Sequence, residues 1–167
     1  MDDLLMEADA VLSDCRKYRY RLRRMWSSDP AAVFVMLNPS TADEREDDAT
    51  IRRCMGFARE WGCGGIVVVN LFAIRSVNPA AIKMAKDPVG PFNNSYIILA
   101  AQDSRERGGK LVCAWGNHGA YLGRGTEVAE GLRKMGADPL CLAVTASGQP
   151  AHPLYQRRGI VPQPYVN

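Results

Sequence analysis

Polar side chains able to bind or activate a small molecule follow the apolar runs of this sequence. Asn38 and Asn70 each stand at the end of such a run, and the two histidines of the chain, His118 and His152, lie in polar segments further along. Amides donate and accept hydrogen bonds, and histidine transfers protons near neutral pH. These residue types predict a polar site built from loops, unless each histidine is an ordinary surface residue.

An acidic segment, residues 43–48, follows the loop that begins at Asn38. One of its carboxylates, Asp43, Asp47 or Asp48, is a candidate general base or a stabiliser of a developing positive charge. The alternative is a solvated loop whose last acids cap the helix that follows.

A basic stretch, residues 16–24, interleaves arginine and lysine with tyrosine. Such a pattern is typical of surfaces that contact phosphates and stack on bases, and the candidates for nucleic-acid backbone contacts are Arg16, Arg19, Arg21 and Arg23. The alternative, which is compatible with the first, is an edge strand with tyrosines facing inward and arginines on its solvated face.

The motifs of several site classes are missing from the sequence. There is no C-x-x-C pair, no H-E-x-x-H motif, no G-x-x-x-x-G-K-[ST] loop, and no G-x-S-x-G elbow around Ser40. The segment at residues 116–119 is too short for a dinucleotide fingerprint. We therefore expect no metal, no cofactor and reduced cysteines.

Apolar runs and helical spacings alternate along the chain. Residues 18–26 alternate as a strand, and a turn at residues 27–30 suggests an antiparallel hairpin with the next run. Buried strands are expected at residues 32–37, 66–69, 110–115 and 139–144. Helices are expected at residues 50–61, 80–86, 94–107 and 124–135.

This order predicts a three-layer α/β/α fold with a central, mostly parallel sheet of four strands and an N-terminal antiparallel edge strand. Residues 1–15 predict a short amphipathic helix and residues 156–167 an extended tail, all within one domain of 167 residues. Ligands of open parallel sheets bind outside the carboxyl ends of the strands, so the loops after the strands should form the site.

Bulk composition is that of a globular protein, with 47% hydrophobic and 23% charged residues. A net charge of +3 neither requires nor excludes a nucleic-acid partner. The acidic N-terminus and the lack of a long apolar run predict a cytoplasmic protein without membrane contact, and indicate no particular oligomeric state.

Six blocks of sequence carry a family resemblance. They are residues 36–43, 48–53, 69–75, 87–91, 114–119 and 148–155. Together they resemble a bacterial and phage family known as domain of unknown function 1643, over nearly the whole chain from about Arg19 to Tyr155.

The order of the blocks also resembles that of the uracil-DNA glycosylase superfamily, with Met36 and Leu154 as departures from its motifs. This resemblance implies that Asn38 positions an attacking water and that Asn70 binds the edge of a flipped base. It further implies that His152 stabilises the leaving base, with Phe72 as a stacking wall.

Three functional hypotheses follow. The first is a glycosylase-like hydrolase of N-glycosidic bonds acting on a nucleobase, nucleotide or nucleic acid, with Asn38, His152 and Asp48 as catalytic residues. The second is a non-catalytic module that binds such ligands. The third is a small-metabolite hydrolase that uses Asp43, Asp47 or Asp48 with His118 or His152. The expected substrate contacts are Pro39, Ser40, Thr41, Asn70, Phe72, Arg75, Trp115, His118 and Tyr155.

Overall fold

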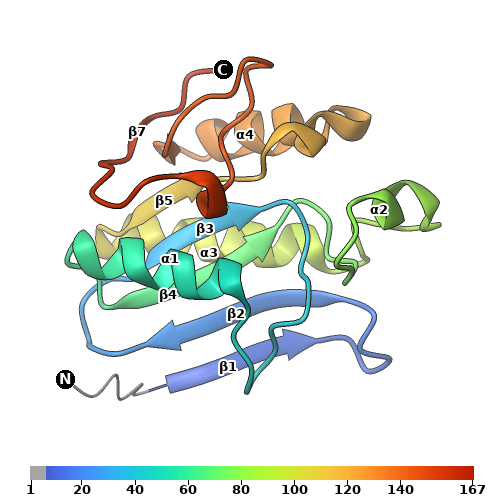
Figure 1. The fold of residues 1–167 in the computed structure, drawn as a ribbon, viewed down its shortest axis with the longest axis horizontal. Coiled ribbons are helices and arrows are strands. Elements are labelled where there is room, and N and C mark those ends of the chain that lie inside the picture. The colour runs from blue at the N-terminus through green and yellow to red at the C-terminus, as the bar shows by residue number, and fades with distance from the viewer. Residues whose placement is uncertain (1–6) are drawn as a thin grey trace.

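A seven-stranded sheet runs through the part of the chain that the computed structural model describes, residues 7–167 (Figure 1). The strand order is β1-β2-β4-β3-β5-β6-β7. The strands are β1 (Glu7–Leu12), β2 (Arg19–Met25), β3 (Ala32–Met36), β4 (Gly65–Asn70), β5 (Lys110–Cys113), β6 (Leu140–Cys141) and β7 (Gln163–Pro164). The α-helices are α1 (Ala49–Glu60), α2 (Ala80–Met84), α3 (Asn93–Arg107) and α4 (Arg124–Lys134), with 3₁₀ turns η1 (Asn117–Gly123) and η2 (Pro153–Tyr155).

The centre of the sheet is parallel and its flanks are antiparallel. Strands β4, β3, β5 and β6 run parallel to one another, whereas β2 and β1 on one side and β7 on the other run antiparallel to their neighbours. The predicted α/β class is confirmed. The prediction of four central strands plus one antiparallel edge strand is too small for the seven-stranded sheet, because it lacks β1 and β7.

Helices cover both faces of the sheet. Helix α1 lies in front of the sheet in Figure 1 and α3 lies behind it. Two apolar clusters fill the spaces between these layers, one including Phe34 and Phe57 of the α1 face, the other including Ile97 of α3 and Leu132 of α4. All five positions of β3 are buried, as expected for a strand covered on both sides.

The N-terminal helix expected at residues 1–15 is not formed where the structure describes that segment. Residues 1–6 lie outside the described part, and Glu7–Leu12 is strand β1, which pairs with β2. The helical spacing of apolar residues is overridden here because β2 offers a free row of backbone hydrogen-bonding groups. Strand β2 is therefore the second strand from the edge.

The expected hairpin between residues 18–26 and 32–37 is also wrong. Strand β2 pairs with β1 and β4, and β3 crosses over to lie between β4 and β5.

A β-bulge in β2 changes which side chains face α1: Val11 pairs with Arg21, but the next residue, Leu12, pairs with Arg19. Tyr20 is the extra residue and stacks on an aromatic ring of α3, so Arg19 faces the α1 side.

The C-terminal segment folds back onto the domain. Trp61 donates a hydrogen bond to the carbonyl of Ile160 at 3.0 Å, and Tyr165 is 5% exposed beside β7.

The strand expected at residues 139–144 is only the two residues of β6, since Val144 forms an isolated bridge with Pro150 instead. Within residues 7–167, no helix has the length and apolar character needed to cross a membrane.

Candidate functional site

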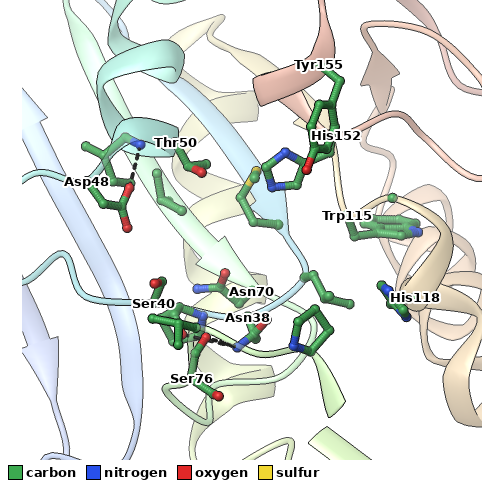
Figure 2. A pocket seen from close by; sticks show the side chains of 18 of the residues that line it. Asn38, Ser40, Asp48, Thr50, Asn70, Ser76, Trp115, His118, His152 and Tyr155 are labelled. Atoms are coloured by element: carbon green, nitrogen blue, oxygen red, sulfur yellow. Dashed lines mark hydrogen bonds between the residues drawn. The ribbon is translucent and has the colours of Figure 1, made fainter. Parts of the chain in front are cut away.

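A pocket of about 580 Å³ opens at the carboxyl ends of β3, β4 and β5, beside the start of α1 (Figure 2). This volume is in the range of small-molecule sites. The structure brings the following predicted residues together in its lining: Asn38, Pro39, Ser40, Asp48, Asn70, Trp115, His118, His152 and Tyr155.

Asn70 lies at the bottom of the pocket at the end of β4. Its side chain is fully buried, and among residues 7–167 neither Nδ2 nor Oδ1 has a hydrogen-bond partner. The neighbouring Asn93 differs, because its Nδ2 donates to the carbonyls of Asn70 and Leu71 at 2.8 and 3.1 Å. The protein thus holds the backbone around Asn70 in place while the Asn70 carboxamide stays free for a ligand.

Asn38 follows β3 and is held by the loop opposite. Its Nδ2 donates to the carbonyl oxygens of Ser76 at 3.0 Å and Ile74 at 3.3 Å, and Figure 2 shows the bond to Ser76 below the pocket. Because Nδ2 is engaged on that side, Oδ1 is the end of the carboxamide that can accept a hydrogen bond from a ligand or a water.

Asp48 stands at the start of α1. Its Oδ1 accepts a hydrogen bond from the backbone N–H of Ile51 at 2.9 Å, so it caps the helix. Figure 2 shows its second carboxylate oxygen turned toward the pocket. Asp48 therefore combines the capping role and the site position that the sequence left as alternatives.

His152 lies across the pocket from Asp48, with Asn70 between and below them (Figure 2). Its Nδ1 accepts a hydrogen bond from the backbone N–H of Leu154 at 3.2 Å. In the neutral ring the proton must then be on Nε2, which becomes a donor. Burial lowers the pKa of His152 below its ordinary value, and the negative charge of Asp48 partly offsets this effect.

Aromatic and polar side chains form the sides of the pocket. Trp115 is 1% exposed and donates from Nε1 to Gln149 at 2.9 Å, which makes it a support for the loop before His152. Tyr155 is 81% exposed and lies 5.7 Å from the His152 ring, centroid to centroid. His118 is exposed at the rim.

Some predicted contact residues lie elsewhere. Phe72 is fully buried in the cluster on the α3 side, because the chain leaves the strand after Asn70 and turns toward that cluster. It cannot be the predicted stacking wall. Thr41, Arg75 and Arg16 line a second hollow of about 450 Å³, which shares Ser40, Ser76 and Val77 with the first.

The arginines expected on the solvated face of β2 occupy different settings. Arg21 forms an ion pair with Asp9 at 3.4 Å and Arg23 one with Glu7 at 3.2 Å, both across to β1. Arg19 is 2% exposed and lines the main pocket. The solvated-face prediction is wrong for Arg19, because the bulge in β2 turns it inward.

Two of the three candidate carboxylates have structural partners outside the main pocket. Asp47 forms an ion pair at 2.8 Å with the buried Arg24. Asp43 accepts hydrogen bonds from the backbone N–H groups of Arg45 and Glu46, which lower its pKa. Only Asp48 of the three lines the pocket. Across residues 7–167, no three His, Cys, Asp or Glu side chains are placed to hold a metal ion.

Several polar lining residues were not among the predicted site residues. Thr50 stands in the first turn of α1, Ser76 in the loop that binds Asn38, and Thr145 and Asn117 are joined by a hydrogen bond of 2.6 Å between their side chains. Their position after strand ends or at a helix start was the available signal.

Fold and site together define an α/β protein with a polar, ligand-sized pocket at the carboxyl ends of its parallel strands. A family model described as "Protein of unknown function (DUF1643)" matches residues 19–154. The match covers most of the chain, which therefore belongs to this family, as the sequence blocks predicted. A search of curated proteins and a search of solved structures each returned no match.

Proposed function

We propose that this protein binds a nucleobase in the main pocket and hydrolyses the N-glycosidic bond that joins the base to its sugar. The observation that carries the proposal is the Asn70 carboxamide, which is fully buried, unpartnered at both polar atoms and part of the pocket lining. A buried amide without partners costs free energy, so such a group is retained where a ligand supplies the missing hydrogen bonds.

The chemistry of a base edge matches this amide. Nδ2 is a donor and Oδ1 an acceptor, side by side, and a nucleobase presents adjacent acceptor and donor groups along one edge. Tyr155, exposed at the pocket mouth and next to His152, is the aromatic ring available for stacking on a base.

Three further side chains fit the hydrolytic steps. Water held by Oδ1 of Asn38 attacks the sugar carbon, the carbon–nitrogen bond breaks and its electron pair passes to the base. Asp48 stabilises the positive charge on the sugar and accepts the proton that the water loses. His152 donates from Nε2 to the leaving base, which finally takes a proton from solvent. The likeness of the sequence blocks to the uracil-DNA glycosylase superfamily adds support for this arrangement.

The small-metabolite hydrolase remains an alternative in a narrower form. Asp43 and Asp47 are engaged elsewhere, so such an enzyme would depend on Asp48 with His118 or His152, which both line the pocket.

The experiment is a base-release assay on oligonucleotides and nucleosides. Single- and double-stranded DNA carrying uracil, hypoxanthine and other modified bases is incubated with the protein, and abasic sites are scored by alkaline strand cleavage. We expect release by the wild type and a loss on the order of 100-fold or more in Asn38→Ala and His152→Ala. Gln102→Ala, which removes an exposed carboxamide from α3 on the opposite face, should keep full activity.

The outcomes separate the hypotheses. Base release that is unchanged in Asn38→Ala and His152→Ala would overturn the proposed roles. Binding of bases that is lost in Asn70→Ala, without release of any base, would favour the non-catalytic module over the enzyme.

A further inference from the structure

Three arginine side chains are buried in the described chain, and they differ in how their charge is satisfied. Arg24 is 1% exposed and Arg124 is 4% exposed. Arg24 forms an ion pair with Asp47 and donates to several backbone carbonyls. Arg124 donates to the Leu71 carbonyl, Asn94 and Glu127. Both have the partners that a buried cation requires.

Arg19 lacks such partners. In the described part of the chain its guanidinium makes one hydrogen bond, from Nη1 to the carbonyl of Ala42 at 2.9 Å, and its Nε is buried without a partner. Within residues 7–167, no carboxylate oxygen lies within 4.0 Å of it, although Asp48 acts on it from further away. Burial lowers the pKa of Arg19 to about 10, so it stays cationic at neutral pH.

Arg19 is also next to the group proposed to read the base. It begins β2, the strand beside β4, and its backbone N–H donates to the carbonyl of Ala73, three residues after Asn70. Both side chains line the main pocket on the α1 side of the sheet. Neighbouring strands are about 4.8 Å apart, so one small ligand can reach both.

We propose that Arg19 is an oxyanion receptor of the main pocket, and that the ligand carries a negatively charged oxygen near the end that Asn70 binds. The proposal rests on the proposed function only in using the same pocket, and it does not require hydrolysis. The bulge in β2 is the device that supplies the receptor, because without the extra residue Tyr20 would take the place of Arg19 on the α1 side.

Two sources of the oxyanion have the same chemistry and are separated by matched ligand pairs. A carboxylate on the ring is tested by a pyrimidine base against the same base carrying a ring carboxylate. A phosphate is tested by a nucleoside against its 5′-monophosphate. The proximity of Arg19 to Asn70 favours the ring carboxylate, since the phosphate of a nucleotide is farther from the base edge.

The experiment measures binding of all four ligands by calorimetry to the wild type, Arg19→Gln, Arg19→Lys and Arg21→Gln. We expect the charged member of at least one pair to bind the wild type on the order of 30-fold more tightly or better. That preference should vanish in Arg19→Gln, survive in part in Arg19→Lys, and be unchanged in Arg21→Gln, whose arginine is paired with Asp9. Absence of a preference in both pairs, or a preference that survives in Arg19→Gln, would overturn the proposal.

Thermal unfolding without ligand separates this role from a structural one. Because Arg19 has no carboxylate within 4.0 Å in residues 7–167 and so contributes no folded-state ion pair, Arg19→Gln should keep or raise the melting temperature, whereas Arg24→Gln, which breaks the ion pair with Asp47, should lower it. If Arg19→Gln lowers the melting temperature as much as Arg24→Gln, the residue is structural and the inference fails. Base release from uncharged substrates would still test the proposed function separately.

Discussion

At the scale of single residues, the pocket contains side chains that are already hydrogen-bonded and side chains that are not. Asn38, Asp48 and His152 each use one polar atom to bind the backbone, and this orients the other atom. Asn70 and Arg19 instead keep buried polar atoms without partners. The first group is positioned in advance, and the second is the part of the site that a ligand would complete.

Replacement of Asn70 by leucine should stabilise the fold and abolish ligand binding. We expect the free energy of unfolding to rise by about 1–3 kcal/mol, because an unsatisfied buried amide is removed and the volume is kept. The measurement is urea unfolding followed by fluorescence. Asn93→Leu is the matched control and should lose stability, since Asn93 makes two hydrogen bonds to backbone carbonyls. A destabilised Asn70→Leu variant would show that Asn70 has a structural role.

The depressed pKa of His152 predicts how stability responds to pH. The folded state binds the proton at His152 less tightly than the unfolded chain does. The contribution of His152 to the free energy of unfolding is therefore complete above pH 6.5, the ordinary pKa of histidine, and decreases as the pH falls below it. Protonation also removes the acceptor for the Leu154 N–H. The decrease in urea midpoint between pH 7.5 and 5.5 should therefore be smaller in His152→Gln than in the wild type. An equal decrease in both proteins would contradict this, and His118→Gln, at an exposed position, is the control.

At the scale of elements, the start of α1 joins a helix cap to the site. The Asp48 carboxylate uses one oxygen for the cap and leaves the other toward the pocket. A helix that packs its apolar face on the sheet thus carries a carboxylate to a defined place beside the pocket, and two substitutions at Asp48 can separate capping from chemistry.

Asp48→Ala should destabilise the protein by about 0.5–2 kcal/mol through loss of the cap, whereas Asp48→Asn should keep the cap because its side-chain oxygen still accepts the bond. Both variants should lose base release, since both lack the negative charge. Urea unfolding and the abasic-site assay measure the two effects. Full activity in Asp48→Asn would remove the carboxylate from the proposed mechanism.

At the scale of the whole molecule, the C-terminal segment supports the pocket from outside it. The Tyr165 ring meets the Trp115 ring edge-on, with 5.9 Å between the centroids. The Arg133 guanidinium lies over the Tyr165 ring, 5.4 Å from its centroid. Trp115 in turn holds Gln149 in the loop that leads to His152. The final residues therefore connect to the site through a buried aromatic pair and through hydrogen bonds to the Gly148 carbonyl.

Tyr165→Ala should destabilise the fold by about 3 kcal/mol, as expected for loss of a buried aromatic side chain. Tyr165→Phe keeps the ring and loses a hydrogen bond to Gly148 that is long at 3.4 Å, so its cost should stay below about 1 kcal/mol. Chemical denaturation of both variants checks this. Equal effects of the two substitutions would mean that the ring packing contributes little.

The sequence by itself determined the α/β class, the helices at the centre of the chain and the family. Local periodicity was sufficient for the fold class and the helices because apolar spacing is a property of short segments, whereas the family came from the resemblance of six sequence blocks. It also indicated the strand-end positions of Asn38 and Asn70, since strand ends can be read from where apolar runs stop.

Only the tertiary structure decided what depends on contacts between distant segments. The pairing of residues 7–12 as β1, the inward turn of Arg19 and the burial of Phe72 all follow from neighbours far along the chain. A one-residue bulge reverses the side chains that follow it, and no local pattern in residues 16–24 specifies where that bulge falls. The identity of the residues came from the sequence, but whether each one faces the pocket, the core or an ion-pair partner was decided by the pairing of strands.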